Sequence, residues 1–308
     1  MVDEFFEQLS HDLEGYSSLI LSHEFLFQNP YAINRICHIA KDLAEEISII
    51  GYSRKQSDYI VSAYCQWWFR SFDRITEINA IVSKLGLNPD LFTGLERQII
   101  ASIVDDFFSA RQLSGYSILD WNKSYEKIIE LTRETCARVI CGVLPNKESD
   151  TSLIQDFCKK ADLTLNPKLI DASKMITNLS FDHDVVEAIN IAVSLGLRVM
   201  GPHEDNQIIA LLSSLSPRKQ KISGFLSDLK SYVNTYFWES ILALCNQFKL
   251  DQAYFTPSHE FDKQEILEAI AREAQIRTLN MPAVIEERRL LSARMIELCI
   301  LLANKSNT

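Results

Sequence analysis

The chain has 308 residues, a formal net charge of −10, and ordinary proportions of hydrophobic (47%) and charged (23%) residues. This excess of acid argues against a general affinity for nucleic acid, which requires clustered lysine and arginine. Nine glycines and eight prolines are about half of average usage, which excludes a turn-rich sheet protein and glycine-rich nucleotide loops. The sequence therefore predicts an all-α multi-helix bundle of roughly eleven or twelve helices.

The expected location follows from the N-terminus and the cysteines. The chain begins Met1-Val2-Asp3-Glu4 without an apolar signal stretch, and no uncharged apolar run of about 18 residues occurs. The seven cysteines are widely spread and form no CxxC pair. We expect a cytoplasmic protein with reduced, buried thiols and no membrane span.

Helix signals begin with Asn29-Pro30, an N-cap followed by proline at the first helical position. Apolar spacing then predicts one helix over 31–50, which Gly51 ends. A long helical segment follows from Ser53 to Leu85, with Gly86 as its stop.

The next signal is Thr93, which has Glu96 three residues later as a capping-box partner. It predicts a helix to about residue 113. Residues 117–141 form a further amphipathic stretch, and Gly142 ends it.

The most polar connector of the chain is 146–152, near its midpoint. It predicts two packed helical subdomains, 1–145 and 153–308. In the second half, helices are expected at 151–161, 167–179, 182–196, 203–215, 217–249, 262–280 and 282–305. The wide apolar face of the last helix is expected to dock on the body of the protein or on a second copy, so a homo-oligomer is one expectation.

Asp182, His183, Asp184 and Glu187 form the best candidate metal site. His183 and Glu187 are four residues apart and share one face of a helix. A histidine and a carboxylate at this spacing are able to ligate Zn²⁺, Fe or Mn²⁺, and residues 203–205 would add ligands if the helix folded back on its successor. A divalent metal is thus the candidate cofactor. The alternative is an ordinary helix start, where acids favour the helix dipole.

A second acidic candidate is Asp105-Asp106, late in a predicted apolar helix. The pair resembles the first metal-binding motif of type I terpene synthases, a family of helical enzymes. That resemblance implies Mg²⁺ ions that bind a diphosphate. Ser109 and Ala110 stand where the family has a third acid. The alternative is two acids on a solvated helix edge.

An aromatic group at Tyr64, Trp67 and Trp68, followed by Arg70, is the candidate interface. Tyr64 and Trp68 are four residues apart and share a helical stripe, whereas the adjacent Trp67 points elsewhere. Core packing is one interpretation. The other is a protein-binding surface, where Trp, Tyr and Arg are enriched.

The chain carries no recognisable nucleophile elbow and no phosphate-binding glycine loop. The leading hypothesis is therefore a non-catalytic cytosolic interaction protein, such as a scaffold, adaptor or regulator, with a protein partner. The alternative is a helical metal-dependent enzyme, or a protein that binds a metal or a small molecule through its histidine and acid clusters.

Overall fold

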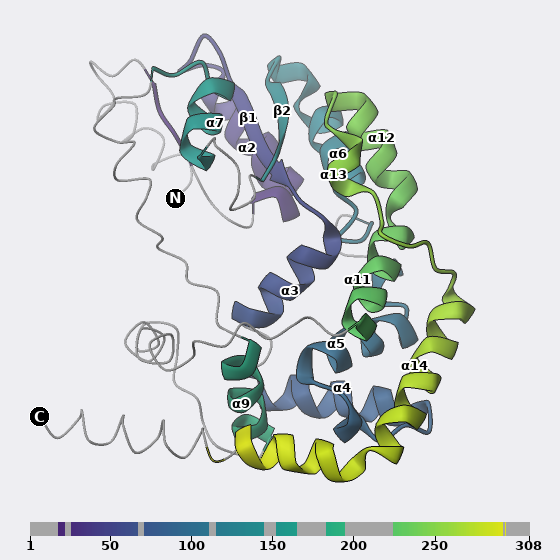
Figure 1. Ribbon diagram of the computed structural model, residues 1–308. Coiled ribbons are helices and arrows are strands. Elements are labelled where there is room, and N and C mark those ends of the chain that lie inside the picture. Colours follow the sequence, from purple (N-terminus) through teal and green to yellow (C-terminus); the bar gives the residue numbers. More distant parts are fainter. Residues whose placement is uncertain are drawn as a thin grey trace, which may run out of the picture. The chain divides into compact units, whose positions relative to one another are not determined.

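The computed structural model describes residues 18–21, 26–66, 71–110, 115–144, 152–164, 183–194, 224–291 and 293. Most of these residues are helical (Figure 1). The sheet that they form has two parallel strands, β1 (Ser48–Ser53) and β2 (Arg138–Val143). The predicted all-α, multi-helix class is confirmed, whereas the small sheet was not predicted.

Backbone contacts divide the chain into two compact units. Unit 1 comprises Met1–Arg54, Ser109–Met175 and Phe237–Phe255, and unit 2 comprises Lys55–Phe108, Ile176–Tyr236 and Thr256–Thr308. Each unit therefore takes segments from both sides of 146–152, of which only Ser152 is described. The linear division into 1–145 and 153–308 stays a prediction about which parts fold independently.

Unit 1 is built around the sheet. Its described helices are α2 (Pro30–Ala40), α6 (Trp121–Thr132), α7 (Leu153–Lys160), α12 (Trp238–Phe248) and α13 (Gln252–Phe255). Successive strand residues point to opposite faces. One face, with Val139 and Cys141, packs against apolar side chains of α2, α6 and α12. On the other face, Tyr52 donates a hydrogen bond to Asp156 of α7 at 2.8 Å.

The helix predicted over 31–50 is shorter than expected, and Gly51 lies inside β1. The stretch 117–141 likewise contains α6 and then β2, which includes Gly142. Space explains both glycines. A Cβ atom at Gly51 would lie 2.2 Å from the Phe27 ring, and one at Gly142 would lie 2.6 Å from the ring of Tyr52, its partner in the strand register. These glycines admit aromatic side chains and do not end helices.

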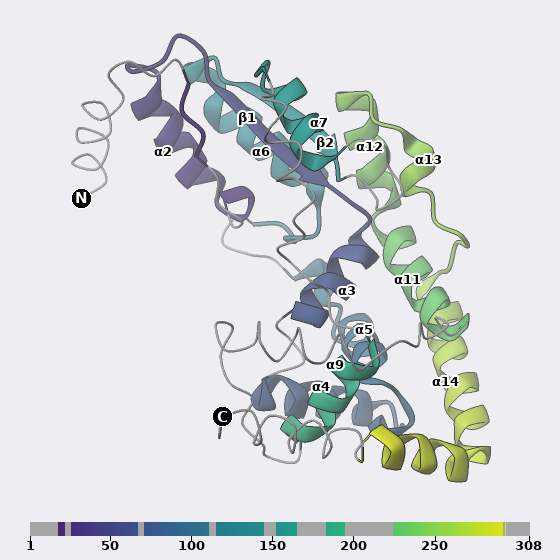
Figure 2. The ribbon, with the colours of Figure 1, turned by 60° about the vertical axis from the view of Figure 1, so that its left-hand side comes forward.

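The described secondary-structure elements of unit 2 are all helices. The unit contains α3 (Gln56–Gln66), α4 (Phe72–Lys84), α5 (Gly94–Val104), α9 (His183–Ser194), α11 (Gly224–Tyr236) and α14 (Lys263–Leu279). Helix α5 contacts α3, α4 and α11, and its residues are buried from Gly94 to Ile103. A helix that is buried on all sides forms the centre of a core. A further helical segment, 281–291, follows α14 (Figure 2).

Short 3-10 turns complete the described elements: η1 (Leu26–Gln28), η3 (Pro89–Leu91), η4 (Phe107–Ser109) and η5 (Arg133–Thr135). The predicted capping signals are confirmed, but the helix that follows Thr93 ends at Val104 and not near residue 113. Thr93 and Glu96 form a capping box, and Gly86 follows α4 with a φ of 72°. The prediction of one helical segment from Ser53 to Leu85 is wrong, because Ser71 caps a new helix, α4. The segment 217–249 is likewise interrupted at Phe237, between α11 and α12.

None of the described helices has both the length and the apolar character needed to cross a membrane.

Candidate functional site

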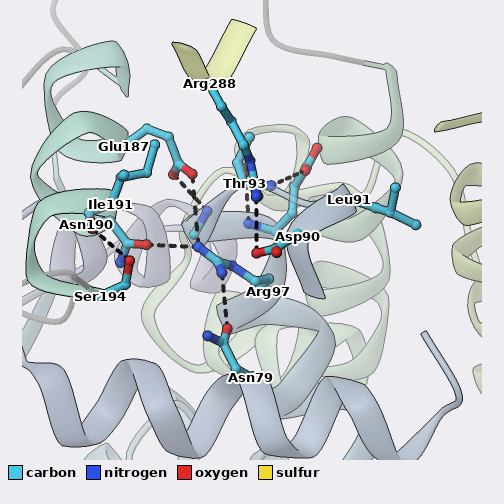
Figure 3. A network of polar contacts seen from close by, with 12 residues as sticks. Asn79, Asp90, Leu91, Thr93, Arg97, Glu187, Asn190, Ile191, Ser194 and Arg288 are labelled. Atoms are coloured by element: carbon cyan, nitrogen blue, oxygen red, sulfur yellow. Dashed lines mark hydrogen bonds and ion pairs between the residues drawn. The ribbon is translucent and has the colours of Figure 1, made fainter. Parts of the chain in front are cut away.

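The carboxylate of Glu187 lies in a buried polar cluster of unit 2 (Figure 3). Glu187 is on α9, and its side chain is 12% exposed. It accepts a hydrogen bond from the backbone N–H of Gly94, 2.7 Å away, at the first residue of α5. Backbone N–H groups at a helix start lack intrahelical partners and favour a negative charge. Glu187 therefore joins α9 to the start of α5.

Arg97 is the centre of the same cluster. Its side chain is 5% exposed, and one terminal nitrogen lies 3.9 Å from Glu187. The guanidinium donates hydrogen bonds to Asn190 at 2.8 Å and to Asn79 at 3.0 Å (Figure 3). These contacts connect α4, α5 and α9. A small cavity beside them is lined by Tyr64, Ile75, Ile78, Asn79, Gly94, Arg97 and Asn190.

Burial raises the pKa of the Glu187 carboxyl above its ordinary value, because desolvation penalises the charged form. The charge of Arg97, the hydrogen bond from Gly94 and the charge of Arg288 all lower this pKa and so oppose the rise. The net direction is upward. The cluster thus holds a carboxylate whose ionisation is costly and whose fixed partners reduce that cost.

The candidate metal site is only partly visible. Asp182 lies outside the described residues, as do 203–205, and His183 and Asp184 are described by backbone alone. Glu187 is the member with a described side chain, and it contacts Gly94 and Arg97. Within the described part of the chain, no group of three or more His, Cys, Asp or Glu side chains is suited to hold a metal. Metal binding at this position stays a prediction.

Asp105 and Asp106 occupy the turn that ends α5. Asp105 is the C-cap residue, and Asp106 has a φ of 52°, in the left-handed region. Their carboxylates lie 3.8 Å from Lys84 and 3.9 Å from Lys263, respectively. The resemblance to terpene synthases implies two acids on a helix, but this pair lies in the turn after the helix. Each of the two carboxylates forms an ion pair with a different lysine.

A second buried ion pair joins Glu96 to Arg277 and was not predicted from the sequence. The Glu96 side chain is 2% exposed, and two Arg277 nitrogens donate to its two oxygens at 2.7 and 2.9 Å. The guanidinium also lies 5.4 Å from the ring centres of both Phe92 and Phe225. The capping box identified Glu96 as a cap, but no local signal connects it to an arginine of α14.

The predicted aromatic interface is described at one residue. Tyr64 is only 2% exposed, so its side chain belongs to the interior of unit 2 and not to a surface. Trp67, Trp68 and Arg70 lie outside the described residues. The part of the interface prediction that rests on them stays a prediction.

Large apolar side chains are instead exposed near the end of the described chain. Ile276 and Leu279 on α14 are 54% and 83% exposed, and Ile285 and Leu290 on the helical segment 281–291 are 58% and 62% exposed. Isolated exposed leucines are common on protein surfaces. These four side chains lie on consecutive helical segments and are candidates for a contact surface.

Comparisons with protein-family models, curated proteins and solved structures found no match to this chain.

Proposed function

We propose that this chain is a non-catalytic cytosolic interaction protein, a scaffold, adaptor or regulator. Its working surface lies on the end of α14 and on the helical segment 281–291. The observation that carries the proposal is the exposure of Ile276, Leu279, Ile285 and Leu290, each more than half exposed. Apolar area buried on association is a main driving force for protein contacts. These side chains provide such area on helices.

The buried charges support the same proposal. Arg97 is fixed by Asn79 and Asn190, and Glu96 is fixed by Arg277. These contacts connect helices of unit 2, so the buried charged groups hold the fold together. The cysteines support a cytosolic location. The six among the described residues are free thiols, as is usual in a reducing compartment.

The test compares tagged full-length protein purified from its native host with two variants. Leu279→Glu places a charge on the proposed surface, whereas Arg272→Glu reverses a charge on the same helix at a side chain that is 67% exposed. Circular dichroism first checks that both variants keep the helical fold. Quantitative mass spectrometry should then show that Leu279→Glu loses a stoichiometric partner that Arg272→Glu retains. An identical set of partners for all three proteins would contradict the proposal.

A further inference from the structure

The helical segment 281–291 has two different faces. Val284, Arg288 and Leu291 are half-buried, and Arg288 forms an ion pair with Asp90 at 3.0 Å. This inner face therefore contacts the rest of unit 2. The outer face is exposed and carries Pro282, Ile285, Glu286, Arg289 and Leu290, with the exposed residues Ala283 and Glu287 beside it. Its spacing of three or four residues is that of one continuous side of a helix.

The outer face is chemically symmetric about the midpoint between residues 287 and 288. On either side of that point stand first a charged residue, Glu286 or Arg289, and then a large apolar residue, Ile285 or Leu290. The two charges have opposite signs. A face with this pattern is complementary to itself when a second copy runs in the opposite direction.

We infer that the segment 281–291 pairs antiparallel with the same segment of a second copy of this chain. The inference rests on the proposed function and names its partner. A two-fold interface requires that residue i contacts residue j and that j contacts i. An axis between residues 287 and 288 satisfies this rule. It sets each Ile285 opposite Leu290 of the other copy and each Glu286 opposite Arg289.

Exposure and charge both favour this occupant. The side chains of Glu286 and Arg289 are 55% and 78% exposed and lie 3.6 Å apart within one helix. Antiparallel pairing brings two such pairs together as a network of four alternating charges, whereas parallel pairing would set Glu286 against Glu286. The apolar residues Ile285 and Leu290 flank the network at both ends and would add apolar contact area.

The expected association is weak. Two single helical segments bury less than the roughly 1,200 Å² of a stable interface. We therefore expect a dimer that forms with increasing protein concentration. High salt should weaken it, because exposed charge pairs are screened.

The test uses charge reversal in the full-length protein and measures mass by sedimentation velocity and native mass spectrometry. Arg289→Glu gives a copy with two acids on the outer face, and Glu286→Arg gives a copy with two bases. Each variant alone should dimerise at least about tenfold more weakly than the wild type, which corresponds to about 1.4 kcal/mol. An equimolar mixture of the two should form a heterodimer. The control Arg272→Glu should behave like the wild type.

Three results would overturn the inference: a wild type that stays monomeric at high micromolar concentration, a dimer that persists in both reversal variants, or a mixture that yields no heterodimer. These failures are distinguishable from a failure of the proposed function. If the wild type is monomeric but Leu279→Glu still loses another protein, the interaction function stands and only the second copy is excluded. If neither effect occurs, both proposals fail.

Discussion

At the scale of single residues, the charged groups of unit 2 show what a sequence can and cannot predict. Glu187 is a recognisable candidate because it stands four residues after a histidine. Its contacts with Gly94 and Arg97 depend on how α9 packs against other helices. Local spacing gives the residue but not its partners, since the partners lie far away in the sequence.

The raised pKa of Glu187 predicts a pH dependence of stability. A carboxyl whose pKa is raised in the folded state stabilises the fold most below its ordinary value of 4.5, and this contribution is lost as the pH rises through the raised value. Glu187→Gln keeps an acceptor for the Gly94 N–H and carries no charge. The variant should match the wild type in free energy of unfolding near about pH 4 and become the more stable protein towards neutral pH.

Urea unfolding at several pH values measures this difference. If Glu187→Gln instead loses stability relative to the wild type as the pH rises, the attraction of Arg97 outweighs desolvation. In that case folding would lower the pKa of Glu187 and not raise it.

The close packing around Gly94 predicts that a larger residue at this position destabilises the fold. A Cβ atom there would lie 1.9 Å from the Tyr64 hydroxyl oxygen and 2.9 Å from the Asn190 side chain. Gly94→Ala should therefore lower the free energy of unfolding by about 1–3 kcal/mol, the usual cost of overpacking a core. Gly224→Ala is the matched control, because nothing lies within 4 Å of its added Cβ. Equal thermal stability of the two variants would show that Tyr64 and Asn190 move aside freely.

At the scale of elements, helix starts were predictable because their signals are local. Thr93 with Glu96 and Asp262 with Glu265 form capping boxes within four residues of chain. The strands were not predictable in this way. Gly51 and Gly142 resemble helix stops, and only the packing of Phe27 and Tyr52 over them reveals their place in a sheet.

The ion pair that attaches α14 to α5 predicts that substitution of Arg277 strongly lowers the free energy of unfolding. Removing its charge leaves the carboxylate of Glu96, which is 2% exposed, buried without its bidentate partner. Arg277→Met should cost about 3–5 kcal/mol, as is typical when one member of a buried pair is removed. Arg272→Met, on the same helix but 67% exposed, should change stability by less than about 1 kcal/mol.

Hydrogen exchange localises the effect of Arg277→Met. Amides of α14 should exchange faster in this variant than in Arg272→Met. If α14 retains wild-type protection in both variants, the ion pair does not hold the helix in place.

At the scale of the whole molecule, each unit is assembled from distant segments. In unit 1, Tyr125 and Cys141 share a core with Ile241 and Leu244 of α12. The fragment 1–145 lacks α12, so it should not unfold cooperatively on its own. Circular dichroism melts of fragments 1–145 and 153–308 check this expectation. A sharp, cooperative transition of either fragment alone would instead support the linear division that the sequence predicted.

The most direct measurement is native mass spectrometry of the purified full-length protein, beside a denatured sample, over a range of concentrations. The proposed function and its inferred partner predict a species with twice the mass of one chain, growing with concentration and carrying no added mass of metal or ligand. A species that stays at the mass of one chain, or one that retains a divalent metal in stoichiometric amount, would contradict this account.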